Sequence, residues 1–407
     1  MTPKRFMLIA GEASGDMLAA ELVKELRAGI QQRPTYTTDL QPLSADLAPR
    51  FFGAGGPGMA AAGVELAFDL TQHSVVGLTD VLKNYRKFKR LFDQLFKLAT
   101  EREPHAIICI DFSGFNRRFA AAIKKYVRAR RGTFNNWEPK IIQYISPQVW
   151  ASREGRAYQM ARDCDLLLSI FPFEQAWYAA RVPKLRVEFV GHPLIDRHRN
   201  AECGVRSAEL DAASTGAFVV LLPGSRKSEL ERHFPVMLEA FRKIHAALPA
   251  AQVTVILPNE NLAQMARLST ERIPGNMPVK IQVGGLSQAL TQATIAIAST
   301  GTVTMECAYF GVPTVTLYKT FGLSLSIYLG IITVKWFTMP NLLANEEIFP
   351  EFLERAATPE NLARAALELL RDKPRRERVQ ARLSEVIASL GGPGASQRAA
   401  EMILKIL

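Results

Sequence analysis

The sequence predicts a two-domain α/β protein in which helices cover both faces of parallel sheets. Its 407 residues suit two domains better than one. Short apolar runs alternate with helix-like segments along most of the chain, which is the pattern of doubly wound sheets. This alternation restarts after Gly191-His192-Pro193. We therefore expect two Rossmann-like halves in tandem, with a cleft between them.

In the first half, residues 1–193, five apolar runs are predicted to be buried strands. Helical spacing fills most gaps between them, whereas 31–46 and 131–138 are polar and typical of surface excursions. The predicted strands are 6–10, 106–110, 141–145, 166–170 and 187–190.

The second half, residues 194–385, repeats the alternation. Thr358 followed by Pro359 marks a helix start, because Thr caps helices and Pro suits their first turn. Residues 386–407 are expected either to cross back onto the first domain or to exchange between the subunits of a homodimer. The predicted elements are strands at 218–222, 253–257, 279–283, 295–298 and 314–317, and basic helices at 374–390 and 395–407.

The surface is basic, since Lys and Arg exceed Asp and Glu by 50 − 39 = 11. An excess of this size favours an anionic partner: a nucleotide, a nucleic acid or an anionic membrane. The four cysteines lack metal-ligand spacing, which favours reduced thiols and no metal site. The apolar run after Lys4 and Arg5 is too short for a signal peptide, so the protein is expected to stay where it is made.

The stretch Gly11-Glu12-Ala13-Ser14-Gly15-Asp16 joins the first strand to a helix. Such a turn lies at the carboxyl edge of the sheet, where α/β folds bind ligands. We expect Ser14 to cap the helix and Asp16 to be a helix-end charge. For Glu12 the residues alone leave two readings, a helix-end acid and a functional carboxylate.

Asp111 follows the second predicted strand and is well placed to act as a base. Asp is also a common helix N-cap, and both interpretations stay open on the residues alone. His192 is interpreted as structural, with a ring hydrogen bond. Gly53 to Gly58 match G-x-G-x-x-G, but Pro57 interrupts the turn and the next helix is short, so we expect a flexible loop lining the cleft.

Two small-residue loops in the second half suit phosphate groups. Leu222-Pro223-Gly224-Ser225-Arg226 and Ser299-Thr300-Gly301-Thr302 each follow a strand and precede a helix. Free N–H groups, hydroxyls and one fixed cation favour a nucleotide diphosphate there. Glu306 lies one turn deeper, either for a ribose hydroxyl or as a surface acid.

Residues 75–96 form the clearest amphipathic segment. Val75, Val76 and Leu78 begin it beside basic residues and could dip into a bilayer interface, although a helix packed on the sheet explains the rest. A second apolar stretch, 321–337, is too interrupted to span a membrane and favours an acyl-chain lining or a membrane-touching lip. The basic residues of the first segment are Lys83, Arg86, Lys87 and Arg90.

As an ordered set, these motifs resemble those of the lipid-A-disaccharide synthases, from the N-terminus to about residue 355. The resemblance implies an inverting glycosyltransferase with two Rossmann-like domains, the GT-B fold. It implies transfer from UDP-2,3-diacylglucosamine to 2,3-diacylglucosamine 1-phosphate (lipid X), giving lipid A disaccharide 1-phosphate and UDP. The segments that carry it are 11–16, Ser146-Pro147-Gln148-Val149-Trp150, 191–194, 222–226, 300–302 with Glu306, and Pro340-Asn341-Leu342-Leu343-Ala344-Asn345.

The resemblance also assigns residues and a location. It implies Asp111 and Glu12 as catalytic acids, with no metal, no cofactor and no nucleic-acid partner. It places the enzyme in the cytoplasm, peripherally on the anionic inner membrane. Donor binding is expected at Gly224, Ser225, Arg226, Thr300, Gly301, Thr302, Glu306 and Asn345, and acceptor or membrane contact at Val75, Val76, Leu78, Lys83, Arg86 and Lys87.

Three positions depart from the family pattern: Ser113 where Pro is frequent, Ser152 where a second Trp is common, and Asn345-Glu346 in place of Gly-Arg. Two rival functions differ in class. One is another UDP-sugar enzyme on this fold, a soluble-acceptor transferase or a 2-epimerase, and the apolar segments disfavour it. The other is a non-catalytic, nucleotide-dependent membrane module, disfavoured by Glu12, Asp111 and Arg226 occurring together.

Overall fold

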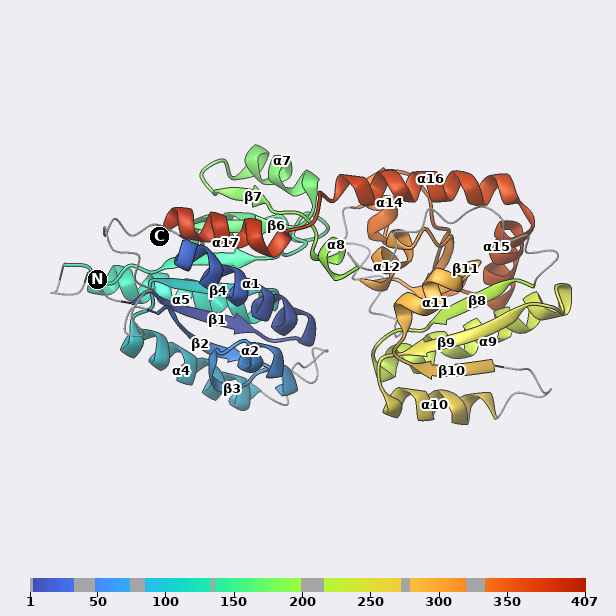
Figure 1. The fold of residues 1–407 in the computed structure, drawn as a ribbon, viewed down its shortest axis with the longest axis horizontal. Coiled ribbons are helices and arrows are strands. Elements are labelled where there is room, and N and C mark those ends of the chain that lie inside the picture. Colours follow the sequence, from blue (N-terminus) through green and yellow to red (C-terminus); the bar gives the residue numbers. More distant parts are fainter. Residues whose placement is uncertain are drawn as a thin grey trace. The chain divides into compact units, whose positions relative to one another are not determined.

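A computed structural model describes residues 3–32, 48–73, 85–132, 136–198, 216–271, 279–319 and 334–407, which form two compact units (Figure 1). Unit 1 comprises Met1–Asp196 and Gly392–Leu407, and unit 2 comprises Arg197–Gly391. Each unit is built on one parallel sheet. The predicted α/β class with two Rossmann-like domains is confirmed.

The sheet of unit 1 has seven strands in the order β3-β2-β1-β4-β5-β6-β7. All neighbouring pairs are parallel. The strands are β1 (Arg5–Ala10), β2 (Arg50–Gly55), β3 (Glu65–Asp69), β4 (Ala106–Ile110), β5 (Lys140–Tyr144), β6 (Leu166–Ser169) and β7 (Val187–Phe189).

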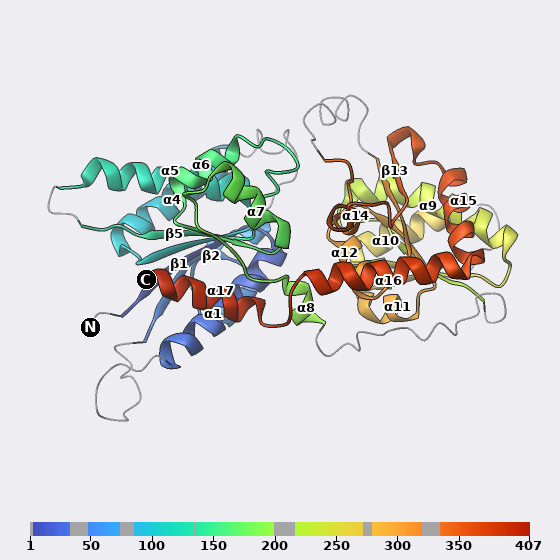
Figure 2. The same ribbon diagram turned by 90° about the horizontal axis from the view of Figure 1, so that it is seen from above.

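Helices cover both faces of this sheet. Helix α17 packs along α1 on one face, while α4, α5 and α6 lie on the other (Figure 2). The C-terminal helix therefore lies within unit 1. The helical elements are α1 (Ala13–Gln32), α2 (Pro57–Ala61), η2 (Thr71–His73), α4 (Tyr85–Arg102), α5 (Ser113–Arg130), α6 (Arg156–Asp163), α7 (Pro172–Arg181), α8 (Pro193–Arg197, at the division between the units) and α17 (Ala395–Ile406).

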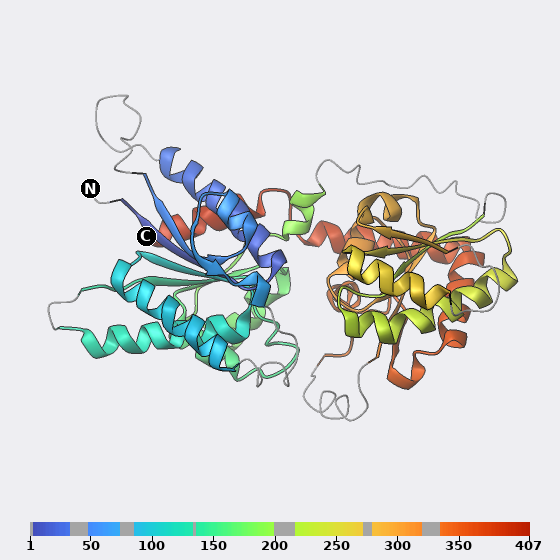
Figure 3. The ribbon, with the colours of Figure 1, turned by 90° about the horizontal axis from the view of Figure 1, so that it is seen from below.

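The sheet of unit 2 has six parallel strands in the order β10-β9-β8-β11-β12-β13. Its main core packs α9, α10 and α15 against one face, as Figure 3 shows for α9 and α10. The strands are β8 (Phe218–Leu222), β9 (Gln252–Leu257), β10 (Val279–Val283), β11 (Ile295–Ser299), β12 (Thr314–Tyr318) and β13 (Glu351–Leu353). The helical elements are α9 (Lys227–Ala247), α10 (Glu260–Thr270), α11 (Leu286–Gln292), α12 (Val303–Tyr309), α14 (Met339–Ala344), η3 (Glu354–Ala356), α15 (Pro359–Arg371) and α16 (Lys373–Ser389).

Every strand predicted from an apolar run is present, with ends within one residue of the prediction. Three strands were missed: β2, β3 and β13. Strand β2 has the sequence RFFGAG, whose glycines conceal the apolar pattern. Strands β3 and β13 are edge strands with partly exposed side chains. Because half-buried edge strands need no continuous apolar run, the hydrophobic pattern of the sequence does not predict them reliably.

Candidate active site

Parallel pairing brings the Gly11–Asp16 turn next to the Asp111 loop. Ala10, the last residue of β1, pairs with Ile110, the last residue of β4, so the chain leaves both strands at the same edge. A Cβ on Gly11 would lie 2.4 Å from the ring of Phe112. Only glycine permits this approach. Glu12 and Asp111 are thereby placed as neighbours at the carboxyl edge of unit 1.

Asp111 adopts a left-handed backbone conformation, with φ 47°, and Phe112 follows with φ 41°. Non-glycine residues in this region cost about 1–3 kcal/mol each and need support from their surroundings. Asn116 donates to the Asp111 carbonyl at 2.9 Å, and the Asp111 N–H donates to Tyr144 O at 3.0 Å. The N-cap of α5 is Phe112, so the capping interpretation of Asp111 was wrong.

The carboxyl group of Asp111 sits in an environment that favours its protonated form. Burial raises the pKa of Asp111 above its ordinary value, and the negative charge of Glu12 raises it further. A hydrogen bond from the Phe112 N–H partly offsets these effects on the pKa. A carboxylate that is reluctant to ionise is a stronger base once ionised, which suits proton abstraction from a hydroxyl.

Asp16 has a structural role in this edge. Its buried carboxylate accepts hydrogen bonds from three backbone N–H groups at the start of α2: Gly56 (2.7 Å), Gly58 (2.8 Å) and Met59 (3.0 Å). The carboxylate therefore joins the first turns of α1 and α2. Ser14 is exposed inside α1, which begins at Ala13, so the prediction that Ser14 caps this helix was wrong.

The expected flexible loop at Gly53–Gly58 was also wrong. Gly53 and Gly55 belong to β2, and Gly56 is the N-cap of α2. Gly53 has φ 149°, and a Cβ there would lie 1.9 Å from Leu8 O of the paired strand β1. Position 53 requires glycine because the backbones of two paired strands are in close contact there, and no dinucleotide is needed to explain it.

In unit 2, the two predicted phosphate loops meet at one pocket of about 540 Å³. Leu222 of β8 pairs with Ala298 of β11, so both loops leave the same sheet edge. The pairing of β8 with β11 thus brings together two loops that lie far apart in the sequence. The pocket is lined by Leu222, Gly224, Ser225, Arg226, Glu229, Ile256, Leu257, Pro258, Gly284, Leu286, Ser299, Thr300, Gly301, Thr302 and Val303.

The cation of this pocket is balanced by an acid that sequence reasoning missed. Glu229 accepts hydrogen bonds from the N–H groups of Ser225 (2.9 Å) and Arg226 (3.3 Å), and its other oxygen meets the Arg226 guanidinium at 3.3 Å. The Arg226 side chain is 47% exposed, so it is accessible to a ligand. Spacing of three residues at the start of α9 is the available sequence signal for this pairing.

His233 supports the same loop from beneath. Its fully buried ring donates from Nδ1 to Pro223 O at 2.9 Å and accepts at Nε2 from the Lys319 N–H at 3.2 Å. A carbonyl only accepts and an amide N–H only donates, so these partners select the neutral Nδ1–H tautomer. Burial lowers the pKa of His233, in agreement with that tautomer.

Two residues expected to bind the donor lie outside the lining of this pocket. Glu306 is only 14% exposed and bonds the ring of His198 at 2.5 Å. Asn345 ends α14 in a left-handed conformation, with φ 54°. Within the same motif, Asn341 is fully buried and exchanges hydrogen bonds with the backbone of Phe349, so it stabilises the fold locally.

Several residues of the expected membrane segment lie outside the described residues: Val75, Val76, Leu78 and Lys83. Residues 321–333 of the second apolar stretch also lie outside them. Arg86 and Lys87 are exposed at the start of α4. Across the part of the chain that the structure describes, no helix combines the length and apolar character needed to cross a bilayer. The same residues contain no cluster of His, Cys, Asp and Glu suited to a metal.

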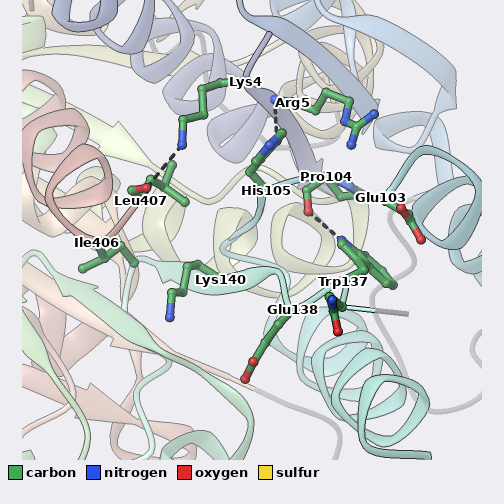
Figure 4. Close-up of a pocket in the computed structure, with 11 residues that line it drawn as sticks. Lys4, Arg5, Glu103, Pro104, His105, Trp137, Glu138, Lys140, Ile406 and Leu407 are labelled. Atoms are coloured by element: carbon green, nitrogen blue, oxygen red, sulfur yellow. Dashed lines mark hydrogen bonds between the residues drawn. The ribbon is translucent and has the colours of Figure 1, made fainter. Parts of the chain in front are cut away.

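A larger pocket, of about 600 Å³, lies at the amino edge of the sheet of unit 1 (Figure 4). Two of its hydrogen bonds join residues far apart in the sequence: Lys4 Nζ donates to Leu407 O at 3.2 Å, and the Arg5 backbone N–H donates to His105 Nδ1 at 3.1 Å. Parallel α/β sheets bind ligands at their carboxyl edges. The smaller pocket and the Asp111 loop both lie at the carboxyl edge of their own sheet.

A family model described as lipid-A-disaccharide synthetase matches residues 6–406. This chain belongs to that family. It is 34% identical to the lipid-A-disaccharide synthase of Trichlorobacter lovleyi, covering 100% of this chain and 98% of the relative. It is 35% identical to that of Geobacter metallireducens, covering 99% and 97%. The chain is accordingly a glycosyltransferase of lipid A biosynthesis, which forms the lipid A disaccharide.

Solved structures with low identity share the fold of this lipid-A-disaccharide synthetase family member. A putative UDP-N-acetylglucosamine 2-epimerase from Listeria monocytogenes is 13% identical, with a TM-score of 0.59 over 99% of this chain and 95% of that one. The calicheamicin glycosyltransferase is 16% identical, with a TM-score of 0.54 over 100% and 99%. These similarities support the GT-B architecture.

Proposed function

We propose that this enzyme transfers the diacylglucosamine unit of UDP-2,3-diacylglucosamine to the 6-hydroxyl of lipid X in a single inverting displacement. The observation that carries this proposal is the Asp111 carboxyl, held beside Glu12 with its pKa raised. Asp111 would accept the proton of the attacking hydroxyl, a contribution of about 10²–10⁴ in rate. Glu12 would position the acceptor or orient the Asp111 loop.

The donor would bind in the pocket of unit 2. Arg226 and the N–H and hydroxyl groups of Thr300–Thr302 line that pocket and would stabilise the charge that develops on the departing UDP. The apolar residues Ile256, Leu257 and Leu286 form a wall suited to the uracil ring. Glu306 remains the proposed ribose acid, and binding there would have to share its carboxylate with His198.

Incubation of the protein with UDP-2,3-diacylglucosamine and lipid X tests the reaction directly. We expect mass spectrometry to show a disaccharide 1-phosphate that contains both acylated sugars, together with an equimolar amount of UDP. Consumption of the donor without a disaccharide, or a 2-epimerised UDP-sugar, would favour the epimerase alternative. The same donor offered with lipid-free glucosamine 1-phosphate measures the contribution of the acyl chains.

We further propose that the N-terminal domain docks on the anionic inner-membrane surface. Basic side chains of α4 surround a surface pocket of about 450 Å³, lined by Arg86, Lys89, Arg90, Asp93, Gln94 and Lys97. Lys87 adds an exposed charge to this helix. Each such cation near an anionic surface contributes about 1 kcal/mol. Val75, Val76 and Leu78, which precede this helix, would add shallow apolar insertion.

Reversing two of these charges should weaken membrane binding. Lys89→Glu with Arg90→Glu removes two attractions and adds two repulsions, so a loss of about 4 kcal/mol predicts roughly 10³-fold weaker binding to anionic vesicles. The control, Arg371→Glu with Arg378→Glu, makes the same change in net charge on exposed residues of unit 2. Equal flotation of the two double variants with liposomes would refute docking through α4. Serine at Val75, Val76 and Leu78 tests the apolar contribution separately.

A further inference from the structure

Glu174 is a fully buried carboxyl that the proposed mechanism does not use. It lies in the first turn of α7, directly after β6. Its Oε1 accepts a hydrogen bond from Trp150 Nε1 at 2.9 Å, and its Oε2 accepts from the Phe171 N–H at 3.4 Å. Among the described residues, no basic side chain forms an ion pair with it. Burying a carboxyl group without a cationic partner costs free energy of folding, so we expect this group to serve a function.

Side chains of α7 contact both ends of the loop that follows β5, residues 146–150. At one end, the Ser146 hydroxyl bonds Tyr178 OH of α7 at 3.1 Å. At the other end, Trp150 donates to Glu174 and packs edge-on against Phe173, with ring centroids 5.0 Å apart. Helix α7 therefore contacts this loop through two side-chain hydrogen bonds and one aromatic pair.

The same loop is tied to the proposed catalytic base. Gln143 Nε2 donates to Ile145 O at 3.2 Å and to Asp111 O at 3.4 Å. Ile145, where the chain enters the loop, is left-handed with φ 68°, and its N–H donates to Leu168 O at 3.0 Å. The Gln143 amide therefore links the backbone at the start of the loop to the backbone of Asp111.

We propose that Glu174 is a positioning residue, whose ionised carboxylate holds the loop 146–150, and through it Asp111 and the acceptor, in the working arrangement. This inference rests on the proposed function for the identity of the acceptor. The two oxygens of a carboxylate can accept from Trp150, Phe171 and Ser146 together. A protonated carboxyl must donate from one oxygen, so one of these bonds is lost or reversed.

The ionisation of this group falls near neutrality. Burial raises the pKa of Glu174 to about 7, against the opposing effect of hydrogen bonds from Trp150, Ser146 and the backbone. Other groups face the cluster. Burial raises the pKa of Tyr178 and of Cys164, so both stay neutral, and His192 packs on Phe171 with ring centroids 5.3 Å apart. Among the acids Glu174, Tyr178 and Cys164, Glu174 is therefore the one whose charge changes near pH 7.

The test combines a spectroscopic and a kinetic measurement on the full-length protein. In ¹H–¹⁵N spectra, we expect the indole N–H of Trp150, assigned by its absence in Trp150→Phe, to titrate with a midpoint near pH 7. Over the same range, KM for lipid X should rise about fivefold towards low pH, the effect of one lost hydrogen bond. KM for the UDP-sugar should not follow this transition.

Glu174→Gln should behave as the permanently neutral form. Its amide oxygen keeps the Trp150 bond, whereas its NH₂ group cannot accept from Phe171. We expect its KM for lipid X at pH 8 to equal the low-pH value of the parent, with no titration of the indole. Glu188→Gln, which removes a carboxylate of β7 paired with Arg186, is the matched control and should retain the parental profile.

Trp150→Phe serves as the second variant should Glu174→Gln fail to fold. It removes a hydrogen bond that lowers the pKa of Glu174, so the transition in KM should move to higher pH. An indole that does not titrate in the parent, or a KM for lipid X that is independent of pH, overturns the inference. The indole titration needs no substrate, so it separates a failure of this inference from a failure of the proposed reaction.

Discussion

Asp111→Asn is expected to fold normally and to lose a factor of about 10²–10⁴ in turnover, the usual contribution of a general base. Asparagine matches aspartate in shape but cannot accept the hydroxyl proton. The bonds to Asn116 and Tyr144 use backbone atoms of this residue, so the substitution leaves them in place, and the asparagine oxygen can still accept from the Phe112 N–H. Disaccharide formation measured at saturating donor and acceptor, with thermal unfolding of the same samples, checks both parts.

The pH dependence provides a second signature of the same carboxyl. A base must be ionised, so activity should rise with pH through the pKa of Asp111, which burial and Glu12 raise. Glu12→Gln removes the neighbouring negative charge and should lower that pKa. The acid limb of the kcat/KM profile should therefore move to lower pH, whatever the effect of the substitution on the maximal rate.

A matched control distinguishes Asp111 from acids that serve the fold. Asp69 ends β3 at the same sheet edge, and its carboxylate accepts from Thr71 and Gln72. Asp69→Asn should keep turnover within about twofold, because those contacts are local and partly exposed. Near-parental turnover in a folded Asp111→Asn protein would exclude Asp111 as the base.

Arg226→Ala should reduce kcat/KM for the UDP-sugar by about 10²–10³, the size expected when a donor to a developing negative charge is removed. Part of this loss should appear in kcat, since the charge on the departing UDP grows in the transition state. Arg226→Lys should recover only part of it, because an ammonium group cannot bind a diphosphate with two parallel hydrogen bonds. Initial rates at varied donor concentration measure each effect.

Helix α9 contains its own control for this substitution. Arg242 pairs with Glu239 three residues away, as Arg226 pairs with Glu229, but it lies outside the pocket lining. Arg242→Ala should leave both kinetic constants unchanged. A similar loss in both variants would attribute the effect to helix stability, and unchanged donor kinetics in Arg226→Ala would refute its role at the diphosphate.

Much of the fold could be predicted because buried parallel strands need continuous apolar runs. The runs at 106–110 and 218–222 match β4 and β8. The glycine-rich strand β2 could not be found in this way. Glycine is required at position 53 of this strand because the backbone of Leu8, in the paired strand β1, leaves no room for a side chain. Such a requirement arises from pairing and leaves no local pattern.

For the site, the sequence indicated which residue types would gather at the strand ends, but not the contacts among them. Arg226 was predicted at the donor pocket and lines it. Its partner Glu229 and the ring of His233 beneath the loop were missed, because each looks like an ordinary helical residue of α9. Glu306 was expected to be open to a ribose, and its bond to His198 depends on a chain segment over 100 residues away.

The sequence by itself determined the two-sheet α/β architecture, the family and the loops that carry the chemistry, since apolar runs and short motifs are local and survive without a partner. Only the tertiary structure decided the pKa values of the acidic residues at those loops and the contacts that hold the loops in place. Burial sets the pKa of Asp111 and of Glu174, and strand pairing decides which groups surround them. Desolvation and hydrogen bonding depend on neighbours that folding brings together, and these neighbours lie far apart along the chain.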